Sequence, residues 1–428
     1  MGARAGTGKS TRRSTVTKGA AMVGAAGGMG LAPGVASAGG GPGTEVAGGG
    51  AVSELSGVAG ITVYVGVGGR GNGIHRLVMD RNTGRLIYRD VAEQNVPGWL
   101  ALDSRQRAIY AGMGGNRVGG WLIDQATGKL TFGNAQPTGT GAYPHVSVDP
   151  TDSVLVGASY GSGTVGVNPI LSPGTLGEPT HVVQHSGPPG PVQPDQSQPR
   201  AHQIPFDPSG RWAVVQDLGL DRVYVYRVNP VIGALIANDP PYTQGALGRG
   251  PRHGSFHPSN RWYYVINELD STMTVFAWDA VRGTLRELQN VSTLREGWQG
   301  ARWSAQVVVH PNGRWVYGSN RDDNGVNPQP RRRIGTAFIE SDDIVVFRID
   351  QSTGMITTVG HQYSGGKNPR NFNIDPSGRF MIVAHQDTDE IVSFRINQTN
   401  GMIEPTGHVI RNIAEPLCIQ FAPRVGVS

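Results

Sequence analysis

A short stretch near the middle of the chain gathers side chains that are capable of acid–base and anion chemistry. Residues 250–270, GPRHGSFHPSNRWYYVINELD, contain two histidines, two arginines and Glu268. Carboxylates and imidazoles act as general acids and bases, and guanidinium groups hold carboxylates, phosphates and developing oxyanions. Whether these side chains meet in one site depends on the elements that carry them.

Two turn motifs that alternate along the chain define those elements. The first has the form DPSGR, and the second is exemplified by RNTGRL and QTNGMI. Each occurs seven times, and an alternating strand such as DIVVFRID precedes each copy of the second turn. The first turn has its anchors at Ser104, Pro150, Pro208, Pro258, Pro311, Pro376 and, in truncated form, Pro423. Repeats of this kind indicate one supersecondary unit that stacks side by side.

The repeat predicts an all-β fold, a seven-bladed β-propeller of four-stranded antiparallel blades. The last repeat, LCIQFAP, stops after one strand, and ITVYVGVGG (61–69) supplies the missing part. We therefore expect the N-terminal strand to close the last blade, which hides the exposed strand edges. A pair of β-sandwiches is the alternative, but it does not predict a matched count of seven.

Propeller topology predicts which side chains meet. The start of the innermost strand and the end of the second strand lie on the same face, around the central channel. Ten residues after each anchor the second strand ends, and only Glu268 and Arg321 are charged there. At the start of the innermost strands Arg200, Arg252 and Arg370 recur after proline, whereas His202 and His253 do not.

We therefore expect His202, Arg252, Glu268 and Arg321 to form a cationic pocket with one carboxylate and one imidazole. Four further side chains at the strand starts are candidates for contacting a substrate. They are Arg200, His253, Arg370 and His145. The structural alternative is an ion-pair network that braces the channel mouth. His257 matches His310 and the aspartates before proline in other repeats, so we interpret it as a turn residue.

From about Ile61 to its end, the chain resembles the seven-bladed propeller lactonase family, which includes 6-phosphogluconolactonases and 3-carboxy-cis,cis-muconate lactonizing enzymes. DLGLDRVYVY and GPRH…NEL are the more specific stretches, since DPSGR occurs in many propellers. The resemblance implies active-site roles for the His of PRAH, the Arg of GPRH, the Glu of NEL and the Arg of NR. These are His202, Arg252, Glu268 and Arg321. Two departures are Arg200, where relatives often have histidine, and a long insertion at 322–341.

Lactone hydrolysis needs an activated water, a stabilised oxyanion and a proton for the leaving alkoxide. We expect Glu268 to act as the general base, Arg252 and Arg321 to bind the substrate anion, and His202 to protonate the leaving oxygen. The same residues suit a carboxymuconate-type cycloisomerase, and a non-enzymatic ligand- or protein-binding propeller is a third possibility. We expect no cofactor and no metal, since no histidine or carboxylate cluster has ligand spacing.

The N-terminal residues predict export. Arg12-Arg13, a mild Gly/Ala stretch and Ala36-Ser37-Ala38 have the arrangement of a twin-arginine signal (residues 1–38), followed by a flexible linker (39–60) and the propeller (61–428). We expect the protein in the periplasm or outside the cell. The one cysteine, Cys418, excludes internal disulfides and is expected in the core.

Charge and hydropathy exclude other classes of partner. The formal net charge is +5, and the five basic residues of the leader account for all of it, so the body is neutral. A neutral body gives no reason to expect nucleic acid as a partner. No apolar stretch reaches the length of a membrane span, about 18 residues. We expect a monomer that acts on a small lactone or another anionic substrate.

Overall fold

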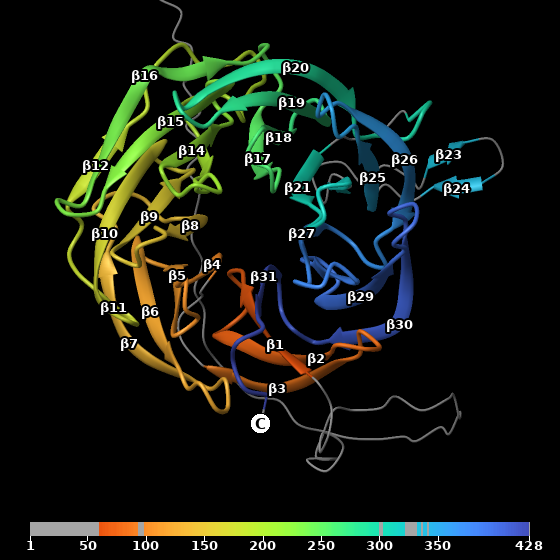
Figure 1. Cartoon of the computed structure of the whole chain (residues 1–428), viewed down its shortest axis with the longest axis horizontal. Coiled ribbons are helices and arrows are strands. Elements are labelled where there is room, and N and C mark those ends of the chain that lie inside the picture. Colours follow the sequence, from red (N-terminus) through yellow and green to blue (C-terminus); the bar gives the residue numbers. More distant parts are fainter. Residues whose placement is uncertain are drawn as a thin grey trace, which may run out of the picture. The chain divides into compact units, whose positions relative to one another are not determined.

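Four-stranded antiparallel sheets, arranged as seven blades around a channel, make up the body of the protein (Figure 1). The computed structural model describes residues 60–92, 98–298, 303–321, 332–334, 337–339 and 342–427. The predicted signal and nearly all of the predicted linker fall outside these residues. No helix in the described ranges is long and apolar enough to cross a membrane.

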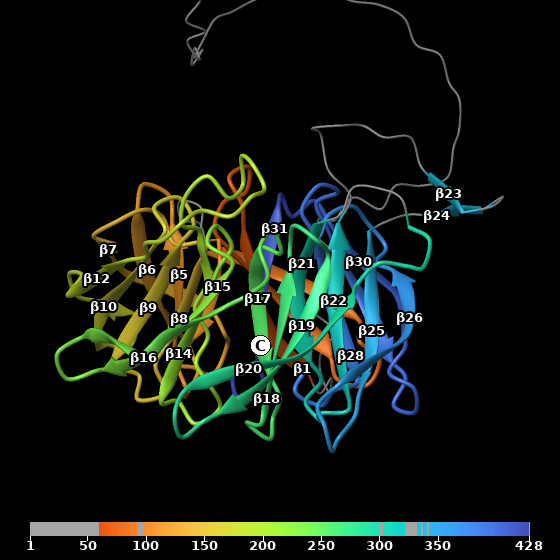
Figure 2. The same cartoon turned by 90° about the horizontal axis from the view of Figure 1, so that it is seen from above.

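The innermost strands of blades 1 to 7 are β31 (Pro416–Ala422), β4 (Leu100–Leu102), β8 (His145–Val148), β13 (Ala201–Gln203), β17 (Pro251–Phe256), β21 (Trp303–Val309) and β27 (Pro369–Ile374). The second strands, in the same blade order, are β1 (Gly60–Val67), β5 (Ala108–Met113), β9 (Val154–Ser159), β14 (Trp212–Asp217), β18 (Trp262–Asn267), β22 (Trp315–Arg321) and β28 (Phe380–His385). Seen from the side, β17, β21 and β22 run between the two faces of the ring (Figure 2).

The third strands are β2 (Ile74–Asp80), β6 (Arg117–Ile123), β10 (Thr164–Ser172), β15 (Arg222–Asn229), β19 (Thr272–Asp279), β25 (Asp343–Ile349) and β29 (Glu390–Ile396). The outer strands are β3 (Leu86–Ala92), β7 (Leu130–Pro137), β12 (His181–Gln184), β16 (Ala234–Gln244), β20 (Thr284–Ser292), β26 (Ile356–Tyr363) and β30 (Ile403–Arg411). β11 (Thr175–Leu176) also pairs with β10, and β23 (Arg332–Ile334) pairs with β24 (Ala337–Ile339).

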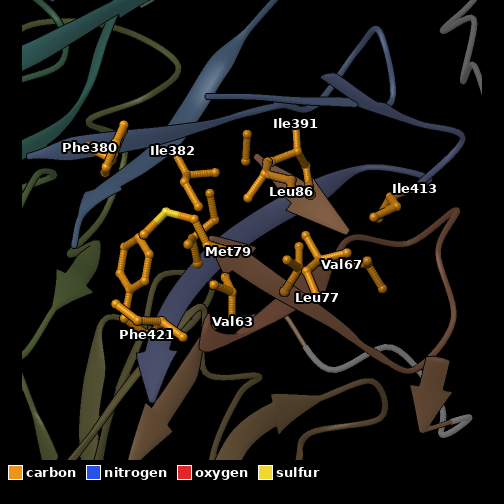
Figure 3. Close-up of a cluster of buried hydrophobic side chains, with 14 residues drawn as sticks. Val63, Val67, Leu77, Met79, Leu86, Phe380, Ile382, Ile391, Ile413 and Phe421 are labelled. Carbon is orange, nitrogen blue, oxygen red and sulfur yellow. The ribbon is translucent and has the colours of Figure 1, made fainter. Parts of the chain in front are cut away.

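The chain ends close the ring as expected. β1 pairs antiparallel with β31, and Val63 lies opposite Phe421. Behind this pairing, apolar side chains of blade 1, such as Met79, pack against Phe380 and Ile382 of blade 7 (Figure 3). Closure therefore rests on shared hydrophobic burial as well as on the strand ladder. The predicted seven-bladed architecture is confirmed.

The first turn of each repeat is held by its own polar side chain. In blade 4 the Asp207 carboxylate accepts hydrogen bonds from the Ser209 hydroxyl and the Trp212 amide. In blade 5 the equivalent His257 contacts Ser259 Oγ through Nδ1 (2.7 Å) and the Gly313 carbonyl of blade 6 through Nε2 (2.9 Å). His257 is a turn residue, as predicted, and it also ties two blades together.

The glycine of the second turn fixes the distance between neighbouring blades. Gly354 of blade 6 has φ +77°, and a Cβ there would lie 2.4 Å from the Trp262 ring of blade 5. Gly401 of blade 7 meets Trp315 of blade 6 in the same way, at 2.6 Å. Each contact needs both a left-handed backbone and the absence of a side chain, which only glycine supplies without strain.

Candidate active site

A β-bulge at the start of the innermost strands aims side chains into the channel. The strand register shifts between Ala201 and Gln203, between Pro251 and His253, and between Pro369 and Asn371. A bulge leaves one residue without a partner and redirects its side chain. The residues left over are His202, Arg252 and Arg370.

Equivalent residues of six blades line one cavity of about 80 Å³ at this end of the channel. Each is the sixth residue before the anchor of its first turn. The six are Gly98, Pro144, His202, Arg252, Arg370 and Leu417, and Trp99 and His253 complete the lining. Such a volume admits several water molecules or one small anionic group.

The register corrects the sequence comparison for Arg200. Ala201 lies opposite Asp217, so His202, and not Arg200, is the equivalent of Arg252 and Arg370. The Arg200 guanidinium lies 4.9 Å from the centre of the Tyr160 ring, and its Nε donates to the Asp195 carbonyl (3.3 Å). Arg200 therefore lies beside the site and does not line the cavity.

Glu268 lies between two arginines from neighbouring blades. It follows β18 of blade 5, and its carboxylate pairs with Arg252 Nε at 3.3 Å and, through the other oxygen, with Arg321 at the end of β22 in blade 6. Glu268 is 8% exposed and Arg252 is 2% exposed. Repeat topology predicted this meeting, and the structure brings these three side chains together.

Arg370 brings a third guanidinium group to this cluster. Within the described part of the chain, no hydrogen bond or ion pair engages its guanidinium, which lines the cavity. Burial, and then the charge of Arg321, lower the pKa of Arg370 to about 10, so it stays protonated at neutral pH. Three guanidinium groups thus face one carboxylate, which leaves two positive charges in excess. A site of this kind favours an anionic ligand.

These charges set the protonation state of Glu268. Burial alone raises the pKa of a carboxyl group, but Arg321, Arg252 and Arg370 outweigh it and lower the pKa of Glu268 below its ordinary value. The carboxylate is therefore ionised at neutral pH and both of its oxygens are engaged. That is a poor arrangement for the general base that the sequence suggested.

Burial and the same positive charges keep His202 neutral. Burial, and then the charges of Arg252, His253 and Arg370, lower the pKa of His202 well below its ordinary value. Its Nδ1 is buried and has no hydrogen-bond partner in the described ranges. A neutral imidazole is available as a base but is a poor acid, so the proposed role of proton donor does not fit this environment.

The comparisons with known proteins agree with this architecture. The family model described as "Lactonase, 7-bladed beta-propeller" matches residues 59–421. The chain belongs to this lactonase family. The family predicted from the sequence resemblance is confirmed.

Proteins that are similar to this chain in sequence or in structure carry related names. The 6-phosphogluconolactonase of Bacillus subtilis is 29% identical over 325 residues, which cover 74% of this chain and 86% of the relative. That of Pectobacterium carotovorum is 32% identical, with 68% and 79% covered. The solved periplasmic gluconolactonase of Pseudomonas aeruginosa superposes with a TM-score of 0.76 at 25% identity, with 86% and 100% covered.

Two of the predicted contact residues, His145 and His253, lie at or next to the cavity and hold neighbouring blades together. His145 Nδ1 accepts a hydrogen bond from the Ile204 amide of the next blade (3.3 Å), and burial lowers the pKa of His145 to about 3. His253 lines the cavity, and its Nδ1 donates to Gln306 Oε1 at 2.6 Å. Both imidazoles therefore join blades, and only His253 also borders the cavity.

Sequence reasoning missed several lining residues. Gly98, Pro144 and Leu417 occupy the same repeat position as His202, so a count back from the anchors would have found them. Trp99 follows Gly98, and its ring lies 4.4 Å from that of His145. Gly98, Trp99, Pro144 and Leu417 give the cavity an uncharged wall from blades 1 to 3, beside the arginines of blades 5 and 7.

A larger groove lies at the other end of the blades. It has a volume of about 520 Å³ and is lined by residues of blades 6 and 7 that include Arg314, Trp315, Arg348 and Asn400. Arg314 precedes β22 while Arg321 ends it, so the groove and the Glu268 cluster lie on opposite faces. No imidazole or carboxylate borders the groove, and we therefore place the chemistry in the smaller cavity.

Two predictions are not tested by the described residues. Of the insertion at 322–341, only β23 and β24 are described, so the expectation that this departure from the family covers or narrows the pocket stays a prediction. Among the described ranges, no group of three or more His, Cys, Asp or Glu side chains is placed to hold a metal ion.

Proposed function

We propose that the protein hydrolyses a lactone that carries a carboxylate, at the cavity lined by His202, Arg252 and Arg370. Membership of the lactonase family supports the reaction class. The unpaired guanidinium of Arg370, in a buried cluster with two excess positive charges, is the single observation that supports an anionic substrate. A carboxylate held by Arg370 would bring that excess close to neutrality.

The roles that suit this geometry differ from those expected from the sequence. Arg370 binds the substrate anion, and Arg252, fixed by Glu268, polarises the carbonyl and stabilises the oxyanion. His202, which is neutral and lines the cavity, takes the proton from the attacking water. Arg370 is one of the charges that lower the pKa of His202, so an anion bound at Arg370 makes His202 a stronger base.

Metal independence follows from the same charges. Both oxygens of Glu268 are taken by arginines, and a divalent cation beside three guanidinium groups would be repelled. The arginines supply the polarisation that a Lewis acid would otherwise provide. We therefore propose a hydrolase that needs no metal ion.

Export restricts the substrate class. Paired Arg12-Arg13 and the Ala36–Ala38 site support a twin-arginine signal, and one structural neighbour is itself named periplasmic. Phosphorylated sugars belong to the cytoplasm, so a carboxylated lactone outside it is the better match. Fractionation of cells that express the full chain tests this. Replacing Arg12 and Arg13 by lysine should retain the protein in the cytoplasm.

Base uptake in a pH-stat tests the activity. Neutral, carboxylated and phosphorylated lactones are compared, with subtraction of spontaneous hydrolysis. Turnover of a carboxylated lactone, at a kcat/KM at least tenfold above that of neutral lactones, is expected. Absence of turnover across the panel by folded protein would overturn the hydrolase. An unsaturated diacid assayed in parallel would then test the cycloisomerase, and failure of both would leave the binding platform.

A further inference from the structure

Tyr160 occupies a repeat position that holds a charged residue of the proposed active site in two other blades. It directly follows β9 in blade 3, ten residues after the anchor Pro150. Glu268 and Arg321 stand at the same position in blades 5 and 6. Side chains at this position therefore reach the channel mouth, and Tyr160 approaches the Glu268 cluster from the other side of blade 4.

The contacts of Tyr160 place it beside the proposed base. Its ring meets the His202 ring edge-on, with centroids 5.5 Å apart and an interplanar angle of 78°. The Arg200 guanidinium covers its face at 4.9 Å. Within the described residues the Tyr160 hydroxyl has no hydrogen-bond partner, yet it is not sealed in the core. Tyr160 is not among the residues that line the cavity, but its ring packs against His202, which does, and its hydroxyl is free to bond a group that extends from the cavity.

The proposed reaction needs a proton donor at the leaving oxygen, and His202 becomes a donor only after it has taken the proton of the attacking water. The oxygen of the lactone ring departs as an alkoxide and must be protonated. Glu268 is ionised, the arginines are weak acids, and His202 starts the reaction neutral. A phenol is protonated at neutral pH and is a stronger acid than an aliphatic alcohol. Burial, and then the charge of Glu268, raise the pKa of Tyr160 further above its ordinary value, which keeps its proton in place until an alkoxide forms.

We propose that Tyr160 donates the proton to the leaving oxygen of the lactone, an inference that rests on the proposed hydrolase. Water gives its proton to His202 and its oxygen to the carbonyl carbon. As the tetrahedral intermediate collapses, the bond from carbon to the ring oxygen breaks, and that oxygen keeps the electron pair and takes the Tyr160 proton. The His202 imidazolium then returns its proton to the phenolate, so both groups are restored.

The arginines support this step. A Tyr160 phenolate would lie in the field of Arg200 and Arg252, both of which stabilise negative charge on it. Arg200, which lies outside the cavity, thereby gains a role as a positioning residue: its guanidinium holds the Tyr160 ring against His202. A relative with histidine at this position would lack that fixed charge.

The test compares Tyr160→Phe with the wild type on two kinds of lactone. With an aliphatic lactone such as D-glucono-1,5-lactone, we expect kcat to fall about 10²-fold, the usual worth of a general acid, with KM changed less than threefold. With the aryl lactone dihydrocoumarin, whose phenoxide needs little protonation, we expect less than a tenfold loss. Tyr88→Phe, on the outer strand of blade 1 and 43% exposed, is the matched control and should match the wild type on both.

The outcomes separate this inference from the proposed function. An active wild type with an unchanged kcat in Tyr160→Phe would overturn the proton-donor role and leave the hydrolase intact. Equal losses on both lactones, or a rise in KM alone, would assign Tyr160 to packing or binding and also overturn it. If dihydrocoumarin is not turned over, the kcat and KM split on the aliphatic lactone decides. A wild type that hydrolyses no lactone refutes the proposed function itself, and the proton-donor role with it.

Discussion

Replacing Glu268 with glutamine should destabilise the fold strongly, because in the described cluster it removes the only carboxylate beside the buried Arg252 and Arg321 and the half-buried Arg370. Glu268 pairs with Arg252 (3.3 Å) and with Arg321. Two unit charges about 4 Å apart attract by about 4 kcal/mol at an effective dielectric constant of 20, and the desolvation of the carboxylate offsets part of this. We expect Glu268→Gln to lower the free energy of unfolding by about 3–5 kcal/mol, the usual cost of leaving a buried charge without its partner.

A matched surface variant calibrates this measurement. Glu287 pairs with Arg249 at 2.9 Å, but 37% of its side chain is exposed, so solvent screens the pair. We expect Glu287→Gln to cost less than about 1 kcal/mol. Both variants are unfolded in urea and followed by tryptophan fluorescence. A Glu268→Gln cost that matches the Glu287→Gln cost would show a solvated network at the channel mouth and refute the electrostatic reasoning.

An added anion sharpens the same experiment. Without the carboxylate, the three arginines attract anions more strongly than the wild-type cluster does. Sulfate should therefore restore part of the lost stability in Glu268→Gln while having a smaller effect on Glu287→Gln. An equal sulfate response in the two variants would mean that the anion acts on the protein surface in general.

Three further predictions follow from the charges of the site. Arg370→Gln should raise KM for a carboxylated lactone by about 10–100-fold in steady-state assays and leave KM for a neutral lactone nearly unchanged, as expected for a lost charge-assisted contact; equal effects on both would contradict anion binding. Burial lowers the pKa of His145 to about 3 and that of His385 to about 4, so as the pH falls below about 6.5 these histidines take up protons in the unfolded chain but not in the folded protein. Each histidine should therefore lower the free energy of unfolding by about 2 kcal/mol between pH 7 and pH 5. The melting temperature should fall over this range, and a flat profile would refute the reasoning. EDTA should leave the hydrolysis rate unchanged; a loss that zinc restores would reveal a metal site.

The architecture was predictable because each repeat carries its own turn chemistry. Asp207 and His257 close the first turn with local hydrogen bonds to Ser209 and Ser259. In the second turn, Gly354 adopts a left-handed backbone that favours glycine. Seven copies of such signals, with a half-repeat at each end, leave few alternatives to a closed ring. The contact of Val63 with the strand that bears Phe421 confirms the closure.

The site was predictable in membership but not in detail. Glu268 and Arg321 were found because they stand at equivalent ends of second strands, where polar side chains meet the channel. Arg200 was misaligned because the proline–arginine pair looks the same as in other repeats; a count of six residues back from each anchor, and the strand register, both give His202 as the equivalent of Arg252. The neutral state of His202 depends on burial among several arginines, which no local sequence pattern reports.

A carboxylated lactone should be bound and cleaved in the cavity lined by His202, Arg252 and Arg370. A crystal structure of the protein with a carboxylated lactam, an unreactive analogue of the lactone, tests it most directly. We expect the ligand carboxylate within hydrogen-bond distance of the Arg370 guanidinium and the lactam carbonyl beside Arg252. A ligand bound only in the groove at Arg314 and Arg348, on the opposite face, would contradict the assignment of the site.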